Sequence, residues 1–155
     1  IGEKITIRRC NFFDGDKDMN FSYVHAELKK NIGKLGVIVC IKSKKFNKQI
    51  KDFGHKLAMH IAASNPLVIE INQLDKKVLE NESEIITEEL KNSGKKANII
   101  EKISKGKLEK FKQENTLINQ IWIMDPKKMV KDVINELDKE NSITIKDFVR
   151  YKVGE

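Results

Sequence analysis

Residues 75–114 read DKKVLENESEIITEELKNSGKKANIIEKISKGKLEKFKQE, and their pattern predicts the most distinctive part of the molecule. Asn92-Ser93-Gly94 is typical of a helix C-terminal cap and tight turn, so residues 75–92 and 96–114 form two helices that run antiparallel. Each helix would be about 27 Å long. Lys and Glu crowd the flanks of a narrow apolar seam, which predicts a protruding helical hairpin, an antiparallel coiled coil. The seam residues are Val78, Ile85 and Ile86 on the first helix, and Ile99, Ile100, Ile103, Leu108 and Phe111 on the second.

Strand patterns precede this hairpin. Residues 4–13 alternate polar and apolar side chains before becoming apolar, which predicts a first strand. Phe21, Tyr23 and His25 fall on one face of a second short extended segment. The β-branched run at residues 35–41 suits a buried central strand.

Residues 46–64 carry the clearest helical pattern, and Asn65-Pro66 ends it because the residue before a proline is pushed out of the helical region. His60 follows the apolar stripe closely and is expected to be a partly buried, hydrogen-bonded core histidine. His55 lies off the stripe beside Lys56, where it is either plain surface or part of a contact. The stripe consists of Phe46, Ile50, Phe53, Leu57 and Ile61.

One more helix and one more strand complete the pattern. Asp125-Pro126 predicts a helix start, with Asp as the N-cap and Pro at the first helical position. Residues 143–153 alternate as a strand, which can pair with the early strands. Strands before and after a helical block favour an α+β domain, an antiparallel sheet with helices packed on one face.

Trp122, Ile123 and Met124 form an apolar cluster in the connector between the hairpin and the last helix. Such a cluster either plugs the core or anchors a partner. Periodicity alone leaves both interpretations open.

The chain has 155 residues and a formal net charge of +7. A basic balance permits nucleic-acid binding, which begins electrostatically. The Lys residues are interleaved with Asp and Glu, however, and a spread of both signs usually means a solvated surface. No apolar run approaches the ~18 residues of a membrane span. We therefore expect neither a nucleic-acid nor a membrane partner, with a basic RNA- or ribosome-binding module as the alternative.

The sequence holds no phosphate-binding glycine loop and no Cys or His spacing that suits zinc, so no cofactor or metal is expected. Cys10 and Cys40 are too few for a disulfide framework and are expected to be buried, reduced thiols, with a thiol at a subunit contact as the alternative. A Cys10 nucleophile with His25 would lack an orienting third group. No catalytic residue is predicted.

Seven short motifs, taken together and in order, resemble the elongation factor Ts family over nearly the whole chain. They are IGEKITIRR at residues 1–9, SYVH at 22–25, IGKLGVIV at 32–39, AMHIAASNP at 58–66, SGK at 93–95, KGKLEKF at 105–111 and FVRYKVGE at 148–155. The resemblance implies a three-stranded antiparallel sheet with packed helices and a projecting coiled coil. It also implies a role: binding elongation factor Tu and speeding GDP release by stabilising the nucleotide-free state, with no bond made or broken.

The resemblance also implies which residues meet the partner. Ile1 and Gly2 match a family pair near the contact with elongation factor Tu, and His25 matches a histidine at the same contact. Ile123 and Met124 match an apolar pair implicated in it, which favours partner binding by the connector. His55-Lys56 occupies the place of a Lys-His pair in reversed order.

On this resemblance, residues 1–155 form the dimerisation domain of the family, with the helical hairpin as an insertion at about 72–116. The small N-terminal helical module and the Thr-Asp-Phe-Val segment of a full factor are absent from this sequence. We therefore expect weak binding of elongation factor Tu and poor GDP exchange by this chain alone, in a bacterial cytoplasm or an organellar matrix. A homodimer is also expected, and a purely structural homodimerisation domain is a further alternative.

Overall fold

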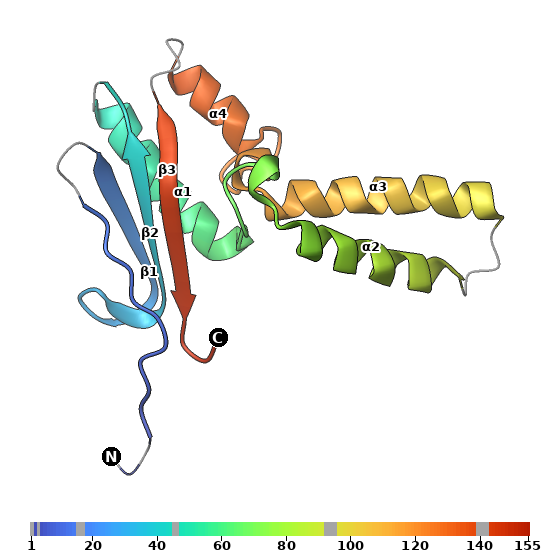
Figure 1. Ribbon diagram of the computed structural model, residues 1–155. Helices are drawn as coiled ribbons and strands as arrows, with labels where there is room; N and C mark the ends of the chain where they lie inside the picture. The colour runs from blue at the N-terminus through green and yellow to red at the C-terminus, as the bar shows by residue number, and fades with distance from the viewer. Residues whose placement is uncertain (1, 3, 15–17, 45–46, 92–95, 139–142) are drawn as a thin grey trace.

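The computed structural model describes residues 2, 4–14, 18–44, 47–91, 96–138 and 143–155. Three strands, β1 (Met19–Lys29), β2 (Ile32–Lys42) and β3 (Thr144–Lys152), form one antiparallel sheet in the order β1-β2-β3 (Figure 1). The central strand is thus the predicted β-branched run, and the last strand of the chain pairs with it. The α+β class and the three-stranded sheet are confirmed.

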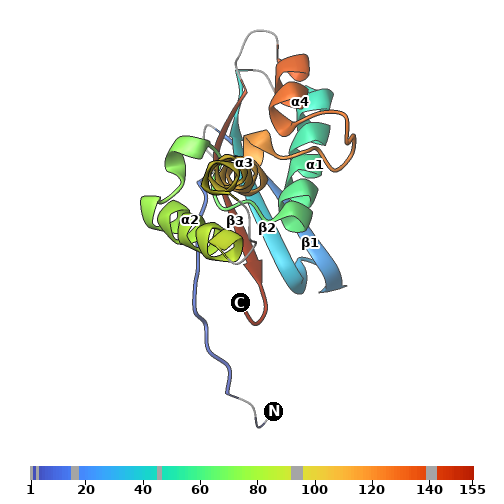
Figure 2. The same cartoon turned by 90° about the vertical axis from the view of Figure 1, so that its right-hand side faces the viewer.

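Helix α1 (Lys48–Ser64) packs on one face of the sheet and encloses the core (Figure 2). The Asn47 side chain caps its first turn by accepting the Ile50 amide at 2.9 Å, and Asn65 ends it in the left-handed conformation. Ile41, Leu57 and Ile61 are among the fully buried side chains, and their burial stabilises the fold. The predicted helix end is therefore confirmed, whereas Phe46, its predicted first residue, lies outside the described residues.

A glycine allows α1 to approach β1 closely. A Cβ atom added to Gly54 would lie 2.4–2.5 Å from ring atoms of Phe21, which is itself buried. Such a distance is far below van der Waals contact, so only glycine lets the helix and the strand meet here. This contact sets the position of α1 over the sheet.

Helices α2 (Lys76–Lys91) and α3 (Ala97–Asn115), called the arm below, lie side by side, run antiparallel and point away from the sheet (Figure 1). Two short 3-10 helices flank them, η1 (Ile71–Gln73) and η2 (Leu117–Asn119). At the base, Leu117 donates its amide to the Val68 carbonyl at 2.9 Å, and Leu67 donates to the Asn115 carbonyl at 3.0 Å. These bonds join the two ends of the arm to each other. The predicted turn, residues 92–95, lies outside the described residues.

The seam of the arm is narrower than the sequence suggests. Ile86 and Leu90 are buried on α2, and no described residue of α3 is fully buried. Ile85, predicted to share the seam, is exposed instead, because the side chain that faces α3 is that of Ile86. Glu89 and Lys107 form an ion pair between the two helices at 2.5 Å.

The prediction of a strand at residues 4–13 is wrong. This segment has no regular structure, and Ile5, Ile7 and Phe12 are 78%, 88% and 89% exposed. An alternating segment forms a strand only where it can pair with a neighbouring strand and bury one face in a core. Here the sheet ends at β1 and β3, and this segment pairs with neither. Cys10, in the same segment, is exposed rather than buried, whereas Cys40 is buried as predicted.

The predicted helix start at Asp125-Pro126 is also wrong. Helix α4 spans Val130–Leu137, and its first turn is held by Asp132, whose side chain accepts the Met129 amide at 2.9 Å. Asp125 instead accepts the Lys127 amide at 3.1 Å within a turn. An Asp in front of a Pro suits a turn as well as a helix start, and in this structure it forms a turn.

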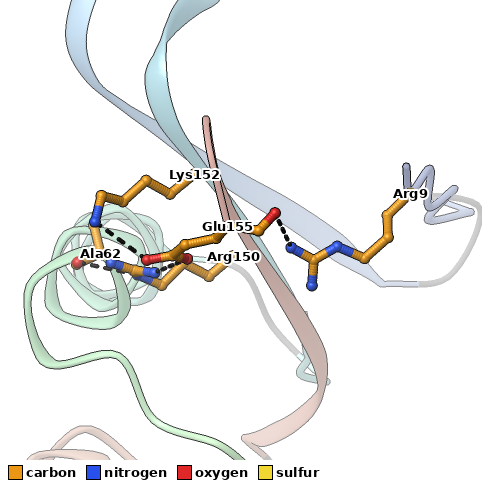
Figure 3. A network of polar contacts seen from close by, with 5 residues as sticks. All are labelled: Arg9, Ala62, Arg150, Lys152 and Glu155. Carbon is orange, nitrogen blue, oxygen red and sulfur yellow. Dashed lines mark hydrogen bonds and ion pairs between the residues drawn. The ribbon is translucent and has the colours of Figure 1, made fainter. Parts of the chain in front are cut away.

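Two segments from opposite ends of the chain meet at the end of β3 (Figure 3). The Glu155 carboxylate pairs with Arg150 at 3.1 Å and with Lys152 at 3.2 Å. Arg150 also donates from Nε to the Ala62 carbonyl at 3.3 Å, which joins β3 to α1. Arg9 donates to the Glu155 carbonyl at 3.5 Å. The N-terminal and C-terminal motifs of the sequence thus form one polar network.

Candidate partner-binding surface

Residues 121–129 form a hydrogen-bonded loop between η2 and α4, beside α1 (Figure 2). Trp122 is buried and donates its amide to the Lys128 carbonyl at 2.8 Å. Ile123 and Met124, in contrast, are 42% and 41% exposed. Trp122 therefore plugs the core, as one of the two interpretations of this cluster predicted. Ile123 and Met124 are exposed to solvent on a backbone that hydrogen bonds of the loop hold in place.

His60 on α1 lies under this loop and is a core histidine as predicted, although it is completely rather than partly buried. Its ring stacks on Trp122 with the centroids 5.1 Å apart. Its Nε2 atom lies 2.9 Å from Gln120 Oε1, and its Nδ1 atom lies 3.4 Å from the Ile123 amide nitrogen. Burial lowers the pKa of the His60 imidazole, although the hydrogen bond to Gln120 opposes this shift. The ring is therefore neutral near pH 7 and can accept the Ile123 amide.

His25 lies on the edge strand β1 and is exposed. Its Nδ1 atom is 3.1 Å from the Tyr23 hydroxyl. Just beyond it, Ala26 has a φ of 52°, and the register of β1 against β2 shifts between Glu27 and Lys29. A Cβ atom on Gly33 would come within 2.8 Å of the His25 carbonyl oxygen, so β2 approaches β1 closely at this point. His25 thus stands at an irregular, solvent-facing strand edge.

His55 and Lys56 lie on the solvent side of α1. The His55 ring meets the buried Phe21 ring edge-on, with the centroids 5.2 Å apart. Successive side chains on a helix are turned by about 100°, so the exposed Lys56 and Met59 lie between His55 on one side of α1 and His60 on the other. The outer face of α1 therefore runs from the β1 edge to the loop that carries Ile123.

Comparison with known proteins identifies the family of this chain. A family model described as "Elongation factor TS" matches residues 1–155. The chain belongs to the elongation factor Ts family.

Among its curated relatives is elongation factor Ts of Zymomonas mobilis, 34% identical over all of this chain and 51% of the relative. Elongation factor Ts of Erythrobacter litoralis and that of Sinorhizobium medicae are each 36% identical, again over all of this chain and 51% of the relative. The chain thus spans about half the length of the relatives it matches. Proteins of this name are translation elongation factors, and the family expected from the motifs is confirmed.

Within this elongation factor Ts family member, the structure groups only some of the predicted partner-binding residues. His55 and Lys56 are exposed on α1, and the Ile123 amide, next to Met124 in the chain, reaches His60 on the same helix. Met59, 38% exposed on the outer face of α1, was missed by sequence reasoning. Its position could have indicated its exposure, because Met59, one residue before His60, is an apolar residue that lies off the apolar stripe of α1.

Of the predicted N-terminal pair, only Gly2 lies within the described residues. Gly2 is exposed, with a φ of 67°, and precedes a segment without regular structure. Ile1 lies outside the described residues. The structure therefore leaves the predicted contact of the N-terminal pair as a prediction.

Among the residues that the structure describes, no cluster of His, Cys, Asp and Glu could hold a metal ion. Four lysines of α3 pair with glutamates: Lys105 with Glu101, Lys107 with Glu89, Lys110 with Glu114, and Lys112 with Glu109. No helix in the described part of the chain is long and apolar enough to cross a membrane.

Proposed function

We propose that this chain binds elongation factor Tu through the outer face of α1 and the 121–129 loop. Binding would contribute to GDP release by stabilising the nucleotide-free state. The observation that carries the proposal is the exposed Ile123–Met124 pair on a backbone anchored by Trp122. Met59 extends the apolar surface along α1. Such an apolar centre among polar neighbours is typical of the energetic core of a protein interface.

Rigidity makes this surface suited to binding. A loop that is ordered before the partner arrives loses little conformational entropy when it binds. Ile123 and Met124 follow a buried tryptophan and precede a hydrogen-bonded turn, so their backbone is already fixed. His55 and Lys56 would meet the partner beside this apolar centre, and His25 at the strand edge.

Nucleotide exchange requires no catalytic group in this chain. If the chain lowers the affinity of elongation factor Tu for GDP, GDP must lower the affinity for the chain by the same factor. The chain spans about half the length of its relatives, so we expect only a small part of the full effect. The test is the release of a fluorescent GDP from elongation factor Tu. A modest acceleration at high concentration of the chain supports the proposal, and no acceleration at any concentration opposes it.

A second candidate function is self-association through the sheet face opposite α1. A groove of about 490 Å³ lies on that face, lined by Val24 on β1, Ile38 on β2, and Val149 and Tyr151 on β3. Cys10 and Asn11 of the N-terminal segment also line it, and Arg9, whose guanidinium lies over the Tyr151 ring, is the one charged residue of the lining. An uncharged apolar patch is self-complementary, as a two-fold interface requires. Two such sheets could pack face to face.

Sedimentation of the chain at increasing concentration tests this second candidate. Val149→Glu should abolish the dimer, because it places an unpaired charge in the groove. Val153→Glu is the matched control, because Val153 is exposed beyond the end of β3. A wild-type chain that stays monomeric throughout would contradict this candidate.

A further inference from the structure

His60 is buried and makes no contact with solvent, yet it touches the backbone of the residue that we place at the partner contact. We infer that His60 is a positioning residue for partner binding: its ring holds the Ile123 amide and so fixes the direction of the Ile123–Met124 pair. The inference rests on the proposed function, because it concerns how that surface is held.

The position of the imidazole proton follows from Gln120. The Gln120 side-chain nitrogen donates to two backbone carbonyls, that of Ser64 at 3.2 Å and that of Glu114 at 2.6 Å. Its oxygen must therefore face His60, so His60 donates from Nε2. The neutral ring then has its lone pair on Nδ1, which points at the Ile123 amide. The Gln120 side chain thus determines that His60 accepts the Ile123 amide through Nδ1.

The remaining contacts keep the ring from turning away. His60 stacks on Trp122, which in turn lies 5.8 Å from the Phe53 ring. Trp122 and Ile123 are adjacent in the chain, so the ring grips the loop at two consecutive residues, one by stacking and one by a hydrogen bond. The Trp122 amide and the Asp125 amide are bonded elsewhere in the loop. Loss of the His60 bond would therefore free the Ile123 peptide without unfolding the loop.

Two substitutions separate the two nitrogen atoms. In His60→Asn the side-chain oxygen can take the place of Nδ1 and accept the Ile123 amide, but the bond to Gln120 is lost. In His60→Gln the side-chain nitrogen can take the place of Nε2 and donate to Gln120, but the Ile123 amide has no acceptor. Both variants lose the ring and its stacking on Trp122, and they differ from each other in size only by one methylene group.

The experiment measures the affinity of both variants for elongation factor Tu, together with their unfolding midpoints and the hydrogen exchange of the Ile123 amide. We expect similar midpoints, a protected amide and the tighter binding in His60→Asn, and a fast-exchanging amide in His60→Gln with binding about fivefold weaker than that of His60→Asn. Equal affinities of the two variants, with Ile123→Ala still weakening binding, would overturn the inference and spare the proposed function. An Ile123→Ala variant that binds like wild type would instead contradict the proposed surface and the inference together.

A measurement on the wild-type chain keeps the inference testable if neither variant folds. Nitrogen NMR distinguishes the two neutral tautomers of a histidine. We expect His60 to carry its proton on Nε2 and to couple across the hydrogen bond to the Ile123 amide. A proton on Nδ1 would overturn the inference.

Discussion

His60 Nε2 and Gln120 Oε1 lie 2.9 Å apart, and this buried hydrogen bond joins α1 to the segment between the arm and the 121–129 loop. Because the same Gln120 side chain also binds carbonyl groups of Ser64 and Glu114, it links the end of α1 with the end of α3. Three parts of the molecule therefore meet at the His60 and Gln120 side chains: helix α1, the arm and the candidate partner-binding loop.

A neutral His60 makes the stability of the fold depend on pH. Burial lowers its pKa in the folded state below the ordinary value of about 6.5. Between that value and the lower folded value, the unfolded chain binds a proton that the folded chain does not. We expect the free energy of unfolding to fall as the pH decreases below about 6.5, by at most about 1.4 kcal/mol per pH unit from this group.

Urea unfolding at a series of pH values checks this expectation. His60→Gln is the control, because it removes the titrating group and should flatten the dependence just below about pH 6.5. An equally steep dependence in the variant would assign the effect to other residues.

Two glycine-to-alanine substitutions should have opposite effects. In Gly54→Ala the new methyl group would overlap the Phe21 ring, and overpacking of this kind costs about 1–3 kcal/mol, which outweighs the better helix propensity of alanine. In Gly106→Ala, within α3, nothing lies within 4 Å of the added atom, so the variant should gain about 0.5–1 kcal/mol. Thermal or urea unfolding measures both. A stabilised Gly54→Ala variant would contradict the close packing of α1 on β1.

The two thiols should differ sharply in reactivity. Burial, followed by Asp18 and Asp147, raises the pKa of the Cys40 thiol, whereas Cys10 is exposed. Since the thiolate is the reactive form, we expect one fast and one slow thiol per native chain with a disulfide reagent. Cys10→Ser should remove the fast phase. Its persistence in that variant would mean that β2 exposes Cys40.

Much of the fold was predictable because its signals are local. The residue 46–64 stripe, the Asn65-Pro66 stop and the periodicity of α2 and α3 each depend on near neighbours in the chain. The failures share one cause. Residues 4–13 alternate like a strand, but pairing depends on the sheet edge that they meet, and Asp125-Pro126 serves a turn as well as a helix.

The candidate surface was predictable only in part. Ile123 and Met124 came from the family resemblance, since periodicity could not tell a core plug from an exposed anchor. The structure divides that cluster, with Trp122 inside and its neighbours outside. The bonds from Gln120 to His60 and from His60 to Ile123 span about sixty residues, and no spacing rule predicts them.

The proposed surface is tested most directly by the affinity of the chain for nucleotide-free elongation factor Tu, measured by calorimetry for wild type, Ile123→Ala, Met124→Ala and the control Ile85→Ala. Ile123 and Met124 belong to the proposed surface, whereas Ile85 is an even more exposed apolar residue on the arm. We predict that each loop variant binds at least about fivefold more weakly, with Ile85→Ala close to wild type. Loop variants that bind as tightly as wild type would contradict the central claim.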